Sequence, residues 1–352
     1  MANEETISTQ QRAINFNLST RQNLQMMAKK NTTTANTGIE FQLPKARLLS
    51  NIYLRVHAKI KATHATKNEI ALSNLAPFKL IQQIKLDLNN GFAPYTISGV
   101  GLGLMNLLDK NAYMILGDSS AYNNAPTKLT ASTTGAENDI AFTIQLPVTL
   151  NGRDPVGLLL LQSDQTIADL RVAVGSPNDM FYGEDITGFT FDLVNFTVEP
   201  MLETFSIPAN TQAFPDLSIL KLVQDRTDSI TSSGQNIVKL STGTIYRKLI
   251  LYFTDENGKP MTDDDLQGNI ELVFNQADTN YSVSAEMLRA VNAVKLGTAI
   301  PTGVYIFDFS DCSYGSSRDF IDTEKLTEFW LRFNAGKRGK VRVISECLSR
   351  LV

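Results

Sequence analysis

The residue types that most often perform chemistry in proteins are scarce in this sequence, and their spacing favours no catalytic or metal centre. The only histidines are His57 and His64, and His57 falls on the polar positions of an alternating segment, which is typical of a solvated strand face. The only cysteines, Cys312 and Cys347, lie 35 residues apart without a second pair, so no zinc site of the Cys-x-x-Cys type can form. We therefore expect no catalytic residue and no metal centre here.

A glycine-rich segment, residues 99–103, partly matches the fingerprint of dinucleotide-binding proteins, whose backbone amides cradle a pyrophosphate. The last glycine of that fingerprint would fall at Leu104, and no regular alternation of strands and helices surrounds the segment. A corresponding segment later in the chain, residues 285–289, contains no glycine. A structural turn before a helix is the favoured interpretation, and we expect no cofactor.

The densest acidic cluster is Asp263-Asp264-Asp265, whose carboxylates could hold a hard cation such as calcium. Its spacing matches no EF-hand loop, so a solvated hairpin and loop is favoured, with an adventitious or intersubunit cation as the alternative. A pair of carboxylates for glycoside hydrolysis would meet only in three dimensions, and nothing in the sequence selects one. The sequence therefore predicts that the protein is not an enzyme.

Composition indicates an ordered globular chain and argues against a dedicated nucleic-acid binder. The 352 residues include 43% hydrophobic and 19% charged side chains, which is typical of packed domains. Thirty-two Lys and Arg against 36 Asp and Glu give a net charge of 32 − 36 = −4, without the basic excess that nucleic-acid binding needs. Residues 1–10 carry no apolar run, and the longest aliphatic run, residues 158–161, is far too short to span a bilayer. We expect a soluble protein made in the cytoplasm.

From residue 38 onward, apolar and polar residues alternate with period two in short runs, which predicts an all-β chain. Prolines 200, 208 and 215 make residues 199–216 a poor central strand, so we expect a domain boundary there. The predicted strands are residues 52–60, 84–88, 140–146, 170–174, 189–193, 245–253, 270–274, 304–309, 329–333 and 341–344.

The sequence repeats itself weakly at an offset of 186 residues. Residues 84–106 align without a gap on residues 270–292, with seven identities in 23 positions. Both copies are predicted to form a strand, an Asn-rich turn, a second strand and a helix of about ten residues. A repeat of this length indicates two similar domains rather than a solenoid, whose periods run at about 20 to 50 residues. The identical pairs are Ile84 and Ile270, Leu86 and Leu272, Asn89 and Asn275, Tyr95 and Tyr281, Ser98 and Ser284, Leu102 and Leu288, and Asn106 and Asn292.

Each half then has about 140 to 170 residues of short strands with an inserted helix. This favours two tandem eight-stranded jelly rolls, a double jelly roll. An immunoglobulin-like sandwich is the alternative, but it needs only about 100 residues and explains no helix at the same place in both halves. We expect an N-terminal arm at residues 1–37, a first jelly roll at 38–205 and a second at 206–352.

Residues 1–37 contain no glycine or proline, and Ser19 or Thr20 is predicted to cap a short amphipathic helix that ends at Lys30. Four basic residues against Glu4 and Glu5 give this arm a charge of +4 − 2 = +2. Basic and apolar residues interleaved in this way suit an anionic membrane surface or a neighbouring subunit; a loosely ordered terminus is the alternative. The candidate contact residues are Arg12, Phe16, Leu18, Arg21, Leu24, Met27, Lys29 and Lys30.

Taken together, the arm at residues 10–30, the strand at 52–60 and the repeated segments 84–106 and 270–292 resemble the double jelly-roll major capsid proteins of tailless, membrane-containing viruses. The likeness is greatest to tectiviruses of Gram-positive hosts. The resemblance implies a pseudo-hexagonal homotrimer that tiles an icosahedral virion capsid, with the arm facing an internal viral membrane. It implies neighbouring trimers, penton proteins and minor capsid proteins as partners, and no direct nucleic-acid contact.

A receptor- or carbohydrate-binding spike or lectin-like protein is the rival hypothesis, since jelly rolls host such functions too. Carbohydrate sites often display clustered aromatic side chains. The single tryptophan, Trp330, falls inside a predicted strand, which favours the capsid hypothesis. Electron microscopy would separate the two, because tiles or shells indicate a capsid protein and isolated glycan-binding trimers indicate a spike.

Overall fold

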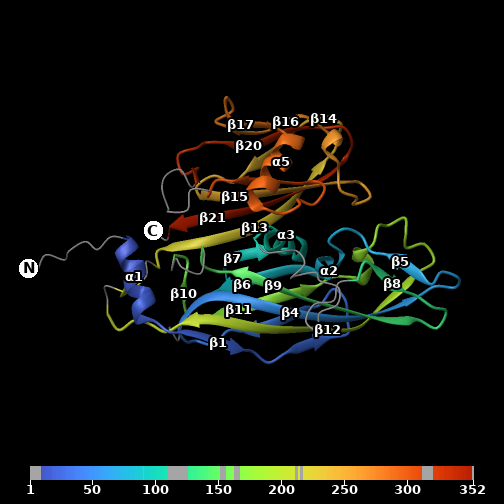
Figure 1. Ribbon diagram of the computed structural model, residues 1–352, viewed down its shortest axis with the longest axis horizontal. Helices are drawn as coiled ribbons and strands as arrows, with labels where there is room; N and C mark the ends of the chain where they lie inside the picture. The colour runs from blue at the N-terminus through green and yellow to red at the C-terminus, as the bar shows by residue number, and fades with distance from the viewer. Residues whose placement is uncertain are drawn as a thin grey trace, which may run out of the picture.

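The computed structural model describes residues 9–89, 91–109, 126–150, 156–161, 167–210, 213–214, 217–310 and 320–350. The chain forms two β-sandwiches, one above the other (Figure 1). The first extends from β1 to β12 and the second from β13 to β21. In both sandwiches the two facing sheets have the same strand order, so the chain is a double jelly roll and the predicted fold class is confirmed.

In the first half, one sheet has β4 and β12 at its centre, with β1 and β2 along one edge of β12 and β9 and β10 along the far edge of β4. The facing strands have the order β7-β6-β11-β3. The bounds are β1 (Gln22–Met26), β2 (Lys30–Thr32), β3 (Gly38–Gln42), β4 (Leu48–Thr63), β6 (Ile81–Leu88), β7 (Phe92–Ile97), β9 (Ala136–Pro147), β10 (Leu159–Leu160), β11 (Ala168–Val174) and β12 (Thr190–Phe205), with β5 (Glu69–Ala71) and β8 (Lys128–Thr130) pairing apart.

In the second half, strands in the order β18-β15-β21-β13 face a sheet of order β14-β20-β16-β17. Strand β13 also pairs with β7, so one sheet runs from the second half into the first. The bounds are β13 (Ile219–Ile230), β14 (Gly234–Leu240), β15 (Ile245–Asp255), β16 (Leu266–Phe274), β17 (Asp278–Ser284), β18 (Val304–Asp308), β19 (Ile321–Asp322), β20 (Phe329–Ala335) and β21 (Gly339–Arg350).

Short helices connect strands in both halves. In the first half α3 follows β7, and in the second half α5 follows β17, as the repeat predicts. The bounds are α1 (Thr9–Ser19), α2 (Ala76–Lys79), α3 (Gly99–Asp109), α5 (Ala285–Leu296), and the 3-10 turns η1 (Pro177–Met180) and η3 (Asp263–Asp265).

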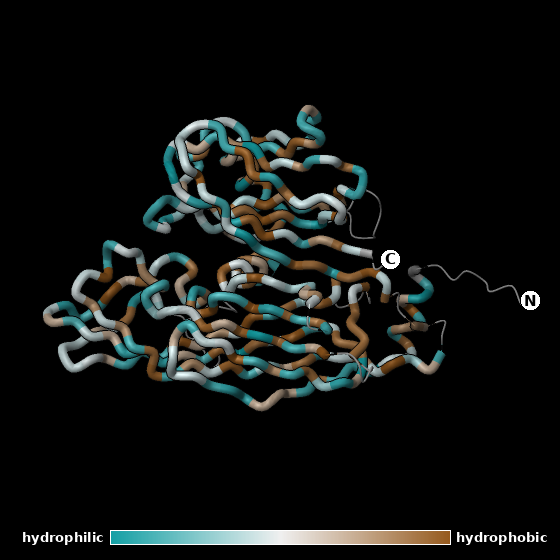
Figure 2. The backbone as a smooth tube through the Cα atoms, turned by 180° about the vertical axis from the view of Figure 1, so that it is seen from behind, coloured by the Kyte–Doolittle hydropathy of each residue, from teal (hydrophilic) through white to brown (hydrophobic). Residues whose placement is uncertain are grey.

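The alternating pattern of the sequence places one face of each strand in a core. In β4, Leu54, Val56 and Ala58 are buried, whereas Arg55 and His57 are exposed. Figure 2 shows hydrophobic stretches running through the interior of both halves, with hydrophilic residues at the outlying loops. Burial of this apolar surface supplies most of the driving force for folding, at about 25 cal/mol per Å².

The sequence repeat is also a structural repeat. Ile84 pairs with Ile97 between β6 and β7, and Ile270 pairs with Val283 between β16 and β17, which is the same register 186 residues later. Ser98 and Ser284 each accept a hydrogen bond from the backbone N–H three residues on, at 2.9 and 3.3 Å, and so cap the following helix.

The identical asparagines in the two helices make one repeated contact. The Asn106 side chain donates to the carbonyl of Gln145 at 2.8 Å and accepts from its N–H at 2.7 Å. Asn292 does the same with Ile306, at 2.9 Å in both directions. Each asparagine therefore joins its helix to the edge strand of the neighbouring sheet and satisfies two backbone groups that no strand pairs with.

The helix predicted to run from Ser19 or Thr20 to Lys30 is wrong. The helix is α1, which ends at Ser19, and the Ser19 and Thr20 hydroxyls donate to carbonyls of its last turn at 2.7 and 2.8 Å instead of capping a new helix. The following residues form β1 and β2, which pair with β12. An unpaired strand edge costs hydrogen bonds, and this tertiary demand outweighs a weak helical spacing. Residues 22–32 therefore extend the first sheet.

The expectation that residues 199–216 form no central strand is wrong for its first part. Strand β12 continues to Phe205 between β4 and the β1–β2 edge, and it includes Pro200. β1 ends at Met26 and β2 begins at Lys30, so the edge strand is interrupted opposite Pro200. The missing N–H of proline therefore falls where no ladder hydrogen bond is made. The division of the chain at residues 37 and 205 stays a prediction.

Candidate assembly surfaces

The contact between the two halves, here called the seam, is built on a strand pair. β7 and β13 run parallel, with Val223 beside Tyr95 and Gln224 beside Thr96. Val223 is completely buried, and the apolar cluster of the first half continues through it into Ile250 and Ile306 of the second half. The seam is therefore a hydrophobic core in its own right as well as a backbone junction.

Helix α3 lies in the seam, and its glycines permit a close approach. A Cβ atom at Gly101 would lie 2.5 Å from the Asp225 carboxylate of β13. That carboxylate accepts from the Ser98 N–H at 3.0 Å and from the Arg342 guanidinium at 2.9 Å. The turn before a helix that the sequence predicts at residues 99–103 is wrong, because these residues already form the first turns of α3. Close packing against β13 is the function of Gly101 in the described structure.

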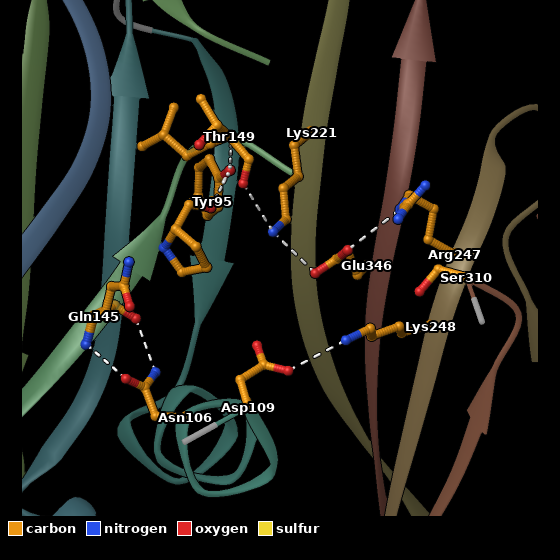
Figure 3. Close-up of polar contacts among 12 residues, drawn as sticks. Tyr95, Asn106, Asp109, Gln145, Thr149, Lys221, Arg247, Lys248, Ser310 and Glu346 are labelled. Atoms are coloured by element: carbon orange, nitrogen blue, oxygen red, sulfur yellow. Dashed lines mark hydrogen bonds and ion pairs between the residues drawn. The ribbon is translucent and has the colours of Figure 1, made fainter. Parts of the chain in front are cut away.

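A buried ion network crosses the seam (Figure 3). The Lys221 ammonium lies 3.0 Å from Glu346 and 3.4 Å from the carbonyl of Thr149 in the first half. Arg247 lies 3.6 Å from the same carboxylate. Both Lys221 and Glu346 are almost fully buried, at 3% and 6% exposure, so each charge depends on its partners.

A second ion pair joins α3 to β15. Lys248 lies 3.2 Å from Asp109 and 3.6 Å from Asp308. Burial opposes the charge of Lys248, but these carboxylates and Glu346 outweigh it and raise the pKa of Lys248. Burial likewise opposes ionisation of Glu346, yet Lys221, Lys248 and Arg247 hold its pKa below the ordinary value. The seam is therefore charged at neutral pH, and its charges compensate one another.

The structure ties some of the predicted arm residues to the protein. Phe16 is 2% exposed and packs edge-on against Phe205, with ring centroids 5.5 Å apart. Met27 is half-buried against the first core, and the Lys30 ammonium lies 5.3 Å from the centre of the Phe41 ring. These side chains anchor α1 and β2 to the first half.

Other predicted arm residues face outward. Leu18 is 82% exposed and Leu24 is 58% exposed. Arg21 and Lys29 are also exposed, and Arg12 is half-exposed. Lys30 is exposed as well, so the structure leaves four basic and two apolar side chains of the candidate set accessible between residues 12 and 30, and Met26 of β1 joins them at 62% exposure.

Sequence reasoning missed an apolar stripe on α5. Met287, Val291 and Val294 are 58%, 38% and 84% exposed. They are four and three residues apart and so share one side of the helix, whereas Leu288 and Asn292 point into the core. The signal was present as an apolar spacing on a second face of the helix.

Most of the residues considered for chemistry in the sequence are buried or make ordinary structural contacts. His57 is exposed, as predicted, with its ring 3.8 Å from Asp139. Cys347 is buried, and burial raises the pKa of its thiol to about 12, whereas Cys312 lies outside the described residues. Asp263 contacts the Tyr305 hydroxyl at 2.7 Å, and Asp265 pairs with Lys337 at 2.9 Å. In the described ranges, no three His, Cys, Asp or Glu side chains gather as metal ligands, and no helix is long and apolar enough to cross a bilayer.

Comparison by sequence finds no matching family model and no matching curated protein. Comparison by structure finds viral capsid proteins. The STIV MCP, from Sulfolobus Turreted Icosahedral Virus, matches with a TM-score of 0.71 at 15% identity, over 94% of this chain and 97% of that chain. The PBCV-1 virus capsid gives 0.66 at 10% identity, over 94% and 93%. The major capsid protein P2 from Bacteriophage PM2 gives 0.55 at 10% identity, over 94% and 98%.

The likeness covers both jelly rolls and nearly the full length of each neighbour. At these identities it establishes a shared fold, and these neighbours are structural proteins of virus capsids.

Proposed function

We propose that this chain is a viral major capsid protein that assembles as homotrimers into an icosahedral shell. One observation carries the proposal: the double jelly roll matches capsid proteins over 94% of its length with a TM-score of up to 0.71. A buried seam that fixes the two halves relative to each other also suits a rigid building block. A shell of this kind needs only weak individual contacts, because each is repeated many times.

The homotrimer is supported by the shape of the subunit. Three copies of a chain with two similar halves place six jelly rolls in a ring, which gives a near-hexagonal tile from one gene product. Exposed apolar side chains occur in both halves, at Leu24 and Met26 in the first and at Val291 and Val294 in the second. Such clusters on a soluble protein usually mark contact surfaces.

The proposed partners include an internal viral membrane. Arg12, Leu18 and Arg21 lie on or next to α1, and they combine positive charge with an 82% exposed leucine. An anionic bilayer attracts such a segment through its surface potential and accepts the apolar side chain. The same proposal includes the other features that the resemblance implies. These are contacts with neighbouring trimers, penton proteins and minor capsid proteins, a location in the virion capsid, and a likeness to the capsid proteins of tectiviruses.

Vesicle flotation tests the membrane contact. We expect the protein to float with vesicles of phosphatidylglycerol and phosphatidylcholine, and the variant Leu18→Asp with Arg21→Glu to remain in the dense fraction. Ile237→Asp, at an exposed residue of β14 at a distance in sequence from α1, is the control and should float like the parent protein. Equal flotation of all three proteins would remove α1 from the proposal.

Electron microscopy of the purified protein tests the function itself. Hexagonal tiles, flat sheets or closed shells are expected. Isolated particles that never associate, at any protein concentration or ionic strength tried, would refute a capsid role and favour the spike hypothesis.

A further inference from the structure

Within one chain, the side of α3 that faces away from its own sandwich is covered by the second half. Met105 and Leu108 are 3% and 7% exposed, and they meet Ile250 and Ile306 beside the seam. The largely apolar composition of α3 follows from this, because every residue from Gly99 to Leu108 is buried and only Asp109 at its end is exposed.

The same side of α5 is uncovered. With the 186-residue offset, Met105 corresponds to Val291 and Leu108 to Val294, which are 38% and 84% exposed. Gly101, which contacts β13, corresponds to Met287, which is 58% exposed. The side chains of the second half that correspond to the seam contact are therefore exposed within one chain, and no surface packs against them there.

The first half carries a surface that corresponds to the one α3 packs against in the seam. The repeated asparagine contact aligns Gln145 with Ile306, and the strand registers then align Tyr53 with Ile250. Ile250 is 3% exposed because the first half covers it, whereas Tyr53 is only half-buried. The outer face of β4 and β9 is therefore the counterpart of the β15 and β18 face in the seam.

The pairing of β12 with its two neighbouring strands corresponds to the pairing of β21 with its own. β12 pairs Glu203 with Leu24 on one side and Asn51 on the other, as β21 pairs Glu346 with Val223 and Lys248. Both central strands are interrupted by a bulge next to these pairs, which supports the alignment. Val223 is completely buried beside β7, whereas its counterpart Leu24 is 58% exposed on an edge strand.

From these correspondences we propose that α5 and β17 of one chain dock on the β1-β12-β4-β9 face of a second copy, so that the seam is repeated between chains. The proposal rests on the homotrimer of the proposed function and names its contact surfaces. It places Val291 and Val294 over Tyr53, Met287 beside Met26, and β17 parallel to β1 with Tyr281 next to Leu24.

The end of the helix carries the opposite charge at this contact from the one it carries in the seam. Asp109 at the end of α3 corresponds to Lys295 at the end of α5, and Lys248 corresponds to Asn51. Glu203, the counterpart of Glu346, is 8% exposed and accepts hydrogen bonds from Asn51 and Tyr53 at 3.3 and 3.4 Å. Within one chain, no described Lys or Arg pairs with Glu203. Docking brings the Lys295 ammonium to this carboxylate, which then has a cationic partner, as its counterpart Glu346 has in the seam.

Each chain carries one docking surface of each kind, so the contact is heterologous. Such contacts extend without limit unless the rotation closes a ring. If the contact between chains copies the seam, the same rotation relates each jelly roll to the next. Closure after three chains then gives the six-membered ring of the proposed trimer.

Sedimentation of purified variants tests the docking. We expect Val294→Asp to weaken trimer association by about a hundredfold or more, since docking would bury an unpaired charge, while circular dichroism stays unchanged. Ile237→Asp, on the edge of its sheet opposite β17, is the matched control and should remain trimeric. A trimeric Val294→Asp protein would overturn the docking and leave the homotrimer standing. A parent protein that never trimerises would overturn both.

Disulfide trapping tests the register. The alignment places Gln25 of one chain beside Ser282 of the next, as Gln224 lies beside Thr96 in the seam. The double variant Gln25→Cys with Ser282→Cys should give covalent dimers and trimers under mild oxidation, because neighbouring strands hold Cα atoms within disulfide range. Each single variant is a control for the native cysteines. Absence of covalent trimers from a trimeric double variant would refute the strand pairing.

Discussion

Replacing Asn292 by leucine removes an amide that pairs with both backbone groups of Ile306, while nearly preserving the side-chain volume. Asn292 is 5% exposed, and its two hydrogen bonds are both 2.9 Å long. Each buried backbone group left without a partner costs about 1 to 3 kcal/mol, so the free energy of unfolding should fall by about 2 to 6 kcal/mol. Asn106→Leu should cost a similar amount, because Asn106 makes the same pair of bonds to Gln145.

Urea titration at one fixed protein concentration measures the effect. The single tryptophan, Trp330, lies in β20 and reports unfolding of the second half, and circular dichroism reports the whole chain. Asn17→Leu, at an exposed position of α1, is the control and should change stability by no more than about 0.5 kcal/mol. A loss below about 0.5 kcal/mol for Asn292→Leu would show that the repeated asparagine contact does not hold the helix to the sheet.

Three further predictions concern the seam and the cores. Lys221→Met should cost about 3 kcal/mol in the same titration, because it leaves Glu346 buried without its 3.0 Å partner, and adding Glu346→Leu should restore much of the loss. The pKa of Glu346 is lowered in the native state, so its contribution to the free energy of unfolding should be complete above the ordinary glutamate pKa of about 4.3 and be lost as the pH falls below that value. A difference in unfolding free energy between the parent protein and Glu346→Gln that stays constant from pH 7 to pH 3 would contradict this. Leu86→Asp and Leu272→Asp should each abolish folding of their half, because both side chains are completely buried, and soluble native-like protein from either would refute the strand phase.

The local elements could be predicted from the sequence where a strand has one buried face. The alternation at residues 52–60 and the repeat at 84–106 both correspond to the observed strands, turn and helix. Even the backbone geometry follows, since Asn89 and Asn275 both adopt positive φ, at 54° and 48°, in the turn where the repeat places them.

Features that depend on distant partners could not be predicted. The residues of β1 have a weak helical spacing, and only the open edge of β12 makes them a strand. Pro200 argues against a central strand until the interruption between β1 and β2 is known. Lys221 and Glu346 are ordinary charged residues in sequence, and their pairing requires two strands to place them on the same buried face.

The assembly surfaces were only partly visible in the sequence. Arg12 and Leu18 could be selected because charge and apolar character interleave there. The stripe on α5 becomes meaningful only by contrast with α3, since burial of Leu108 and exposure of Val294 cannot be read from residue type.

A cryo-electron microscopy map of the assembled protein would show whether the seam is repeated between chains. We expect a ring of six jelly rolls from three chains, in which the six junctions between neighbouring jelly rolls are alike and α5 lies on the β4 and β9 face of the next chain. A map with α5 facing solvent, or with chains joined through any other pair of surfaces, would contradict this expectation.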